Sequence, residues 1–162
     1  MLSIRKMKRE DVSEVSRLLC RCYKWLCDVE GFAKEYADFL VSKRGSVETI
    51  KNESEDQRYF VAFENNAIVG MAAVKENEIT RLYVDPKWHR KGIGTKLFNA
   101  AEEFIRKSGY GDVILGVLGS FAVRFYETMG MTISGLKKRP TGIAGNTEVI
   151  LMKKELNFKQ ST

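Results

Sequence analysis

The stretch Leu82-Tyr83-Val84-Asp85-Pro86, followed by Trp88-His89-Arg90-Lys91-Gly92-Ile93-Gly94-Thr95-Lys96, is the most informative part of the sequence. Residues 79–84 favour a β-strand, and Asp85-Pro86 stops it because proline has no N–H for the sheet and restricts the preceding residue. From Gly94 onward apolar residues recur every three or four positions and predict an amphipathic helix, which ends at Ser108-Gly109. The sequence therefore predicts a strand, a short turn with two glycines, and a helix.

The turn between this strand and this helix combines three features that bind anions. The first N–H groups of a helix have no partners within it, the helix dipole places partial positive charge there, and glycines let a ligand approach the backbone closely. Arg90, Lys91 and Lys96 add side-chain charge. The pattern predicts a cradle the size of a diphosphate, and a tight turn with a solvated basic rim is the alternative.

Two common nucleotide-binding motifs do not fit this turn. The chain contains no Gly-x-x-x-x-Gly-Lys-Ser/Thr spacing, which argues against a Walker A loop. Leu97 stands where the dinucleotide-binding fingerprint has its third glycine. The turn alone therefore does not identify the anionic ligand, and the surrounding sequence is needed to identify it.

The remaining segments predict further strands and helices. Before the turn, β-prone runs on either side of Asn65-Asn66 predict a hairpin, and apolar residues at helical spacing predict helices. After it, the nearly all-apolar run 113–118 predicts a strand covered on both faces. The fold class is therefore α/β, with strands and helices around one sheet. We expect strands at 2–7, 59–63, 68–74, 79–84, 113–118, 131–136 and 148–152, and helices at 12–26, 32–40, 47–50, 94–107 and 121–129.

Size and composition indicate one folded domain. The chain has 162 residues, of which 44% are hydrophobic and 30% charged, so intrinsic disorder is excluded. We place the domain at residues 1–156 and a short tail at 157–162. The net charge of +6 suits an anionic ligand: a nucleic acid, a phospholipid or a phosphorylated cofactor. No stretch resembles a signal peptide or a membrane span, so we expect a cytoplasmic protein without a membrane partner.

The cysteines and the single histidine do not predict a metal site. Cys20, Cys22 and Cys27 lie in one predicted helix, and His89 is far away in sequence, so a closed zinc site lacks ligands. Cys20 and Cys27 would lie ~10.5 Å apart along the helix axis, beyond disulfide reach. We expect buried or half-buried free thiols and no metal; a redox or catalytic role is the alternative.

Two motifs in this chain resemble the GNAT superfamily of acyl-CoA-dependent N-acetyltransferases. His89-Arg90-Lys91-Gly92-Ile93-Gly94, after the strand ending Leu82-Tyr83-Val84, is similar to the family's Gln/Arg-x-x-Gly-x-Gly/Ala motif. Phe125-Tyr126-Glu127-Thr128-Met129-Gly130-Met131 is similar to its aromatic-Tyr pair and glycine-apolar step, and residues 149–156 resemble its last strand. The resemblance spans most of the chain. It implies a mixed, mostly antiparallel central sheet, flanked by helices and splayed between its two central strands.

The resemblance implies acetyl-CoA as the cosubstrate, bound in the gap between those strands. The main chain of residues 82–84 would pair with pantetheine, and the turn at 89–95 would hold the diphosphate. His89 stands where the family has Gln or Arg, and Gly119 stands where many relatives have an asparagine, so that contact would fall to Ser120. The expected cofactor-binding residues are Leu82, Tyr83, Val84, His89, Arg90, Lys91, Gly92, Ile93, Gly94, Thr95, Ser120 and Phe125.

The resemblance also implies a general acid and a base for N-acetyl transfer to a primary amine of a small molecule or protein. Tyr126 matches the acid, because a phenol of pKa ~10 can protonate a departing thiolate whose thiol has a pKa of ~8.5. The alternative is that Tyr126 only packs its helix onto the sheet. Glu78 matches the base, with a solvated strand-end glutamate as the alternative, and Tyr83 can instead serve a water chain.

The first two predicted helices are the candidates for binding the acceptor amine. Asp28, Glu30, Glu35 and Asp38 lie there among aromatic residues and can hold a cation; an acidic solvated face over core aromatics is the alternative. Two other functions stay open: a non-catalytic acyl-CoA-binding or sensing domain, and a nucleic-acid-binding module suggested only by the net charge. We expect the enzyme, with no nucleic acid partner and with homodimer formation as an open question.

Overall fold

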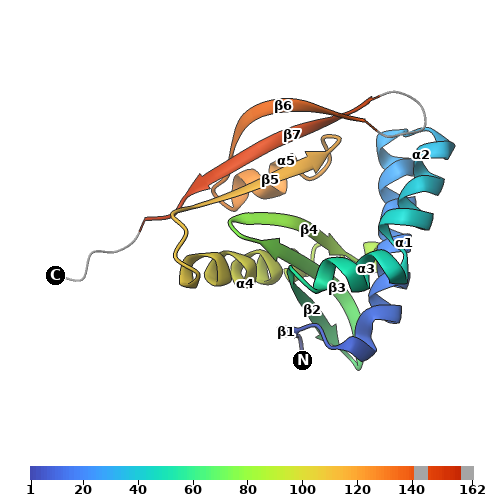
Figure 1. The fold of residues 1–162 in the computed structure, drawn as a ribbon, viewed down its shortest axis with the longest axis horizontal. Helices are drawn as coiled ribbons and strands as arrows, with labels where there is room; N and C mark the ends of the chain where they lie inside the picture. Colours follow the sequence, from blue (N-terminus) through green and yellow to red (C-terminus); the bar gives the residue numbers. More distant parts are fainter. Residues whose placement is uncertain (141–145, 158–162) are drawn as a thin grey trace.

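The computed structural model describes residues 1–140 and 146–157 of the chain. Within these residues seven strands form one sheet in the order β1-β2-β3-β4-β5-β7-β6 (Figure 1). All neighbouring strands are antiparallel except β4 and β5, which run parallel. The strands are β1 (Ser3–Lys6), β2 (Arg58–Glu64), β3 (Ala67–Lys75), β4 (Glu78–Val84), β5 (Asp112–Leu118), β6 (Thr132–Pro140) and β7 (Asn146–Glu155).

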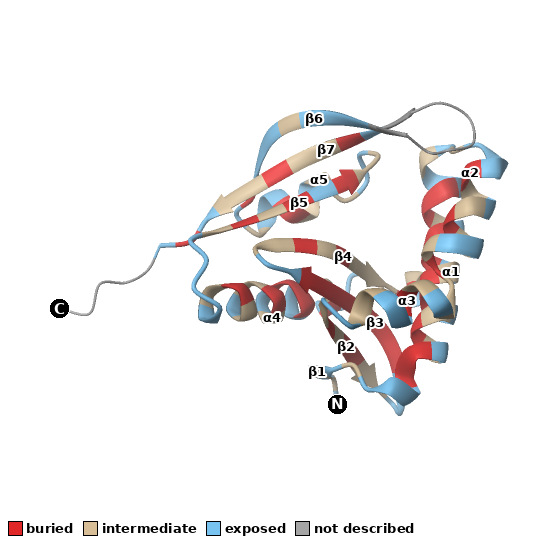
Figure 2. Cartoon of the chain, viewed as in Figure 1, coloured by how far each residue is buried: buried red, intermediate tan, exposed pale blue. Residues whose placement is uncertain are grey.

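Helices cover both faces of this sheet. The apolar stripe of α1, which includes Val15 and Leu18, packs on β2 and β3 in a core cluster shared with α2 and α3. On the opposite face Phe98 of α4 and Tyr126 of α5 share a cluster with β5 and β7. Between the two layers β3 is buried along its length apart from its ends (Figure 2). The helices are α1 (Val12–Glu30), α2 (Lys34–Phe39), α3 (Val47–Ser54), α4 (Ile93–Lys107) and α5 (Val123–Thr128), with a π-helical turn at Leu40–Arg44 and 3-10 turns at Arg9–Asp11 and Pro86–Trp88.

The two central strands separate after a single paired position. In the described sheet β4 and β5 are paired only at Glu78 and Ile114, near the start of β4. β5 pairs instead with β7 along its whole length. The two parts of the sheet, β1–β4 and β5–β7, therefore diverge beyond that position (Figure 1). This confirms the sheet that the resemblance implied, splayed between its two central strands.

A β-bulge in β4 decides which side chains face α1. The register with β3 skips Thr80, which has no partner there. Ile79, before the bulge, lies in the core cluster with α4. Arg81, after the bulge, turns to the opposite face and donates to the hydroxyl of Tyr23 in α1. The bulge thus places a guanidinium group under the first helix.

Most of the predicted elements are confirmed, although their ends differ by a few residues. The first helix continues past Leu26 to Glu30 and ends at Gly31, which adopts the left-handed φ of 69°. The segment expected as one helix at 32–40 is α2 continued by a π-helical turn. The tail expected at 157–162 lies outside the described residues apart from Asn157.

The three cysteines are free thiols, as the sequence predicts. Cys22 and Cys27 are buried, and Cys20 is half-buried. Burial raises the pKa of Cys22 to about 12, so this thiol stays protonated at neutral pH. The described part of the chain holds no cluster of three or more His, Cys, Asp and Glu side chains suited to a metal ion. None of its helices is long and apolar enough to cross a membrane.

Candidate active site

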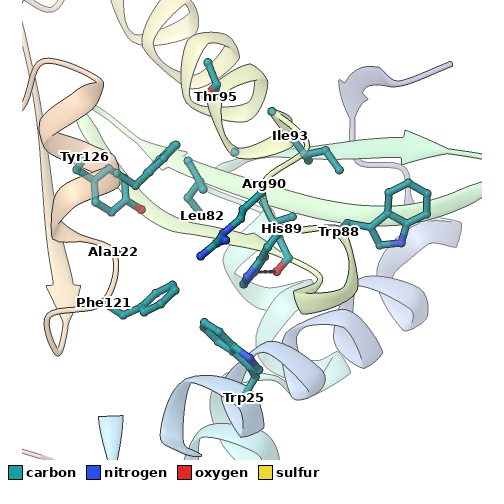
Figure 3. A pocket seen from close by; sticks show the side chains of 14 residues that line it. Trp25, Leu82, Trp88, His89, Arg90, Ile93, Thr95, Phe121, Ala122 and Tyr126 are labelled. Carbon is teal, nitrogen blue, oxygen red and sulfur yellow. Dashed lines mark hydrogen bonds between the residues drawn. The ribbon is translucent and has the colours of Figure 1, made fainter. Parts of the chain in front are cut away.

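A cavity of about 370 Å³ lies where β4 and β5 diverge, on the face covered by α4 and α5 (Figure 3). β4, the turn before α4, the first turn of α4, the turn before α5 and α5 itself all contribute to its lining, and α1 contributes one tryptophan. Most of the lining is apolar. The lining residues are Trp25, Leu82, Val84, Trp88, His89, Arg90, Gly92, Ile93, Gly94, Thr95, Phe121, Ala122, Phe125 and Tyr126.

The turn into α4 has the geometry of an anion cradle. Gly92 is the N-cap of α4 and adopts a φ of 79°, and Arg90 also has a positive φ, of 63°. Glycine has no side chain with which to cap the helix, and the N–H of Lys96 donates to the carbonyl of Gly92 at 3.2 Å. The N–H groups of Ile93, Gly94 and Thr95 therefore stay available at the positive end of the helix dipole. This cradle opens into the apolar cavity, so an anion attached to an extended apolar chain fits both parts.

His89 is held by the backbone and shapes the cavity. Its Nε2 lies 3.0 Å from the carbonyl oxygen of Val84, and since a carbonyl can only accept, Nε2–H donates (Figure 3). Trp25 packs edge-on against the His89 ring at 4.8 Å and against the Phe121 ring at 4.7 Å. The three rings line one side of the cavity. The hydrogen bond to Val84 therefore fixes the position of the His89 ring in the cavity wall.

Tyr126 places a free hydroxyl at the cavity (Figure 3). The residue is 7% exposed, and its ring packs against Phe125 at 5.1 Å and Phe98 at 6.3 Å. Within the described ranges the hydroxyl has no hydrogen-bond partner. Burial raises the pKa of Tyr126 above the ordinary value of a phenol, so the hydroxyl is protonated at neutral pH. It can therefore donate to a group that enters the cavity.

The end of α1 is joined to the turn before α5 across the gap in the sheet. The Glu30 carboxylate accepts from the backbone N–H groups of Ser120, at 2.8 Å, and Phe121, at 2.7 Å. Gly119 adopts a φ of 75°, and a Cβ there would collide with the Glu30 carboxylate. Glycine at this position therefore leaves room for the Glu30 carboxylate.

A second cavity, of about 230 Å³, lies at the same gap on the face covered by α1. Residues of α1, α2, the π-helical turn, β4 and β5 form it. Its lining combines aromatic rings with two arginines. The lining residues are Tyr23, Tyr36, Phe39, Leu40, Arg44, Thr80, Arg81, Tyr83, Gly116 and Leu118.

Arg81 is the buried centre of a hydrogen-bond network beside this second cavity. Its side chain is 1% exposed; Nη1 donates to the Tyr23 hydroxyl at 3.1 Å and to the Arg44 carbonyl at 2.7 Å, and Nη2 donates to Glu53. Glu53 also accepts from Nη1 of Arg44 at 2.8 Å and from the Tyr59 hydroxyl at 2.9 Å. Burial raises the pKa of Glu53, but the charges of Arg81 and Arg44 outweigh it and hold the pKa below its ordinary value. Glu53 is therefore an ionised and fully bonded carboxylate.

The first cavity gathers most of the residues that the sequence predicts for the site. These are Leu82, Val84, His89, Arg90, Gly92, Ile93, Gly94, Thr95, Phe125 and Tyr126. Lys91 and Ser120 do not line it: Lys91 is exposed, with Nζ 5.1 Å from the centre of the Trp88 ring, and the Ser120 N–H binds Glu30. Tyr83 lines the second cavity instead. Glu78 lies at the closed end of the splay and lines neither cavity.

The sequence reasoning did not identify three aromatic residues of the first cavity. Trp25 belongs to the first helix, which the sequence indicates as a candidate for binding the acceptor, but it lines the cavity on the α4 face. Trp88 and Phe121 flank the two family motifs, at positions next to His89 and shortly before Phe125. That adjacency was the available signal for them. Phe121 is 52% exposed, which is unusual for such a large apolar side chain in a folded domain.

Comparisons with known proteins agree with the fold. Residues 28–156 match the acetyltransferase (GNAT) domain family. The chain is 30% identical over 141 residues to an uncharacterised N-acetyltransferase of Methanocaldococcus jannaschii, covering 79% of this chain but only 59% of that protein's length. It is 26% identical over 144 residues to the spermidine N(1)-acetyltransferase of Thermoplasma acidophilum, covering 82% of this chain and 89% of that one.

A solved structure shows the same fold. The crystal structure of the PaiA N-acetyltransferase from Thermoplasma acidophilum, in complex with coenzyme A, superposes with a TM-score of 0.81 at 24% identity. The alignment covers 96% of this chain and 99% of that chain. Together with the family match over residues 28–156, this means that the chain belongs to the GNAT acetyltransferase family.

Replacing Gly94 by Val is expected to weaken coenzyme A binding about tenfold or more. A Cβ at this position would lie 3.3 Å from the Phe125 ring, so a branched side chain would fill the space between the cradle and α5. Titration calorimetry with coenzyme A measures the effect. Asn99→Val, at an exposed position of the same helix, controls for the change in helix propensity. Unchanged affinity in Gly94→Val would show that the cofactor does not pass between Gly94 and Phe125.

Proposed function

We propose that this protein transfers an acetyl group from acetyl-CoA to a primary amine, with the cofactor in the first cavity. The observation that carries the proposal is that the N–H cradle at the start of α4 and the free Tyr126 hydroxyl open into one apolar cavity at the gap in the sheet. Diphosphate suits the cradle and the pantetheine arm suits the apolar lining. The family match over residues 28–156 and the coenzyme A complex of a protein with the same fold support this reading.

The proposed reaction joins the amine directly to the acetyl carbon. The amine nitrogen attacks the thioester carbonyl, a C–N bond forms, and the C–S bond breaks with its electron pair on sulfur. Of the two protons that an ammonium substrate loses, one ends on the coenzyme A thiol and the other in solvent. Tyr126 is proposed to give the thiolate its proton, because its hydroxyl is protonated, lines the cavity and has no partner among the described residues.

Glu78 is proposed to accept the amine proton through water. It lies four residues before Leu82 in β4, and a strand rises ~3.3 Å per residue, so roughly 13 Å separate it from the cofactor cavity. Direct proton transfer over such a distance is excluded by geometry. Glu53, the carboxylate closer to the second cavity, is bound to two arginines and is a weak base for that reason.

Glu78→Gln is expected to lower kcat/KM about tenfold at neutral pH, and the loss should shrink at higher pH. The reason is that more of an alkylamine, with pKa ~10.4, is then unprotonated without help from a base. Rates measured from pH 7 to 10 check this. Glu76→Gln, an exposed carboxylate two residues earlier, is the matched control. Parallel pH profiles for Glu78→Gln and the unmodified protein would remove Glu78 from the mechanism.

Thiol release from acetyl-CoA in the presence of an amine panel tests the proposal as a whole. Spermidine belongs in that panel because one relative is named as a spermidine N(1)-acetyltransferase. Turnover with any amine, confirmed by mass spectrometry of the acetylated product, supports the enzyme. Coenzyme A binding without turnover on any amine would favour the non-catalytic acyl-CoA sensor.

We also propose that residues 1–156 form the acetyltransferase domain, and that the protein acts in the cytoplasm on an amine without a nucleic acid or membrane partner. The 21 acidic residues are interspersed among the 27 basic ones along the chain, which supports the absence of a nucleic acid partner. Steeply salt-dependent DNA binding would contradict it. Sedimentation of the full chain decides whether a homodimer forms.

A further inference from the structure

The second cavity lies at the gap in the sheet, on the face opposite the first cavity. Neighbouring residues of β4 point to opposite faces, so Leu82 lines the cofactor cavity while Tyr83 lines the second one. On β5, Gly116 and Leu118 line the second cavity beside the same gap. Because β4 and β5 are paired only at Glu78 and Ile114, no strand pairing closes the gap at these positions. A molecule in the second cavity therefore approaches the thioester from the face opposite the cofactor.

The charge of this second cavity is positive. Arg44 and Arg81 both line it, and their guanidinium groups share the single carboxylate of Glu53. One positive charge is therefore left without a carboxylate in this network. Arg44 is the more accessible of the two arginines, with 34% of its side chain exposed, against 1% for Arg81.

Donors in this network lack acceptors. The Nε of Arg81 is buried and has no hydrogen-bond partner in the described structure. Arg44 uses only Nη1 on Glu53, and no acceptor is present for its other N–H groups within the described ranges. A buried donor without a partner is costly, and a planar carboxylate is the group that matches a guanidinium fork best. The free N–H groups of Arg44, whose side chain is 34% exposed, point to a ligand that brings its own anionic oxygen atoms.

The acidic residues that the sequence indicated as candidates for binding a cationic amine do not line this cavity. Asp28, Glu35 and Asp38 are exposed, and the Glu30 carboxylate is bound to the turn before α5. In the part of the chain that the structure describes, the cavity thus lacks the free carboxylate that would hold the second ammonium group of a polyamine. Two guanidinium groups would repel such a charge.

We propose that the acceptor is a small amine that carries a carboxylate, with the carboxylate bound by Arg44 next to the Arg81–Glu53 pair. The aromatic rings of Tyr23, Tyr36 and Phe39 enclose the rest of the molecule. This inference rests on the proposed acetyl transfer and specifies its substrate class. The carboxylate takes no part in bond making: the same C–N bond forms, the same C–S bond breaks, and the carboxylate fixes where the nitrogen lies.

Matched pairs of amines test the inference on the unmodified protein. Phenylalanine is compared with phenethylamine, ornithine with putrescine, and spermidine is added as a polyamine without a carboxylate. The member with the carboxylate is expected to have a kcat/KM about tenfold higher or more. Acetylation of spermidine, putrescine and phenethylamine at equal or higher rates would overturn the inference and leave the proposed function standing. Coenzyme A binding with no turnover of any amine would overturn both.

Arg44→Gln tests the residue that carries the inference. It is expected to remove most of the preference within each pair, chiefly by raising KM for the member with the carboxylate. Lys43→Gln is the control, because Lys43 is exposed, adjacent and outside the cavity lining. Arg44→Lys keeps the charge and is expected to keep part of the preference. Coenzyme A affinity shows that each variant is folded, and a preference that survives Arg44→Gln would overturn the role of Arg44.

Discussion

Replacing Tyr126 by Phe is expected to lower kcat by roughly 10²- to 10⁴-fold, the range for loss of a general acid. The ring stays and keeps its packing on Phe98 and Phe125. The hydroxyl makes no hydrogen bond to the described residues, so its removal leaves no protein group unpaired. Stability and the Kd for coenzyme A should therefore remain within about twofold, and only the step that releases the thiolate should slow. Single-turnover rates and calorimetry separate the two effects.

Tyr110→Phe is the matched control for this substitution, since Tyr110 is 36% exposed in the turn after α4. A second test uses pH. Because burial raises the pKa of Tyr126, the protonated form persists above the ordinary phenol value of ~10, so kcat should not fall on the alkaline side below that pH on account of Tyr126. An unchanged kcat in Tyr126→Phe would show that Tyr126 is not the general acid and that it only packs α5 onto the sheet.

The local pattern of the sequence predicted the part of the fold around the cofactor. A strand stopped by Asp85-Pro86, two glycines, and apolar residues at helical spacing are all short-range signals, and the structure shows β4, the turn and α4 there. The splayed sheet followed from the family resemblance, because no periodicity reports which strands pair. The ends of some helices differ from the predicted ends where a long-range contact stabilises the last turn. In α1, for example, Glu30 binds the turn before α5.

The first two helices do contribute to the second cavity, but its arginine network was not predicted because long-range contacts form it. The sequence pattern of the strand does not distinguish Arg81 from its neighbours. Only the bulge at Thr80 turns its side chain toward α1. Its partner Glu53 lies 28 residues earlier, in α3, where it looks like a solvated helix residue. The acidic residues of the first two helices gave a stronger sequence signal, and the structure leaves most of them in solvent. Charge patterns alone therefore do not identify the charged residues that line this cavity.

The same network predicts a large loss of stability when its carboxylate is removed. Glu53→Gln is expected to lower the free energy of unfolding by about 3–5 kcal/mol, the cost of leaving a buried charge without its partner. Arg81 is 1% exposed and relies on Glu53 for its carboxylate, so the substitution leaves a guanidinium group in the interior with neutral partners only. Chemical denaturation at neutral pH measures the difference.

Glu55→Gln, an exposed carboxylate two residues on, should change that free energy by no more than about 0.5 kcal/mol. The sign of the pH dependence is also fixed. The folded protein holds the pKa of Glu53 below its unfolded value, so the stabilisation is complete above the ordinary glutamate pKa of ~4.3 and is lost as the pH falls through the lower folded value. The gap between the unmodified protein and Glu53→Gln should therefore narrow below about pH 4. A gap under about 1 kcal/mol at neutral pH would mean that water reaches Arg81, and the second cavity would then lack its buried charge.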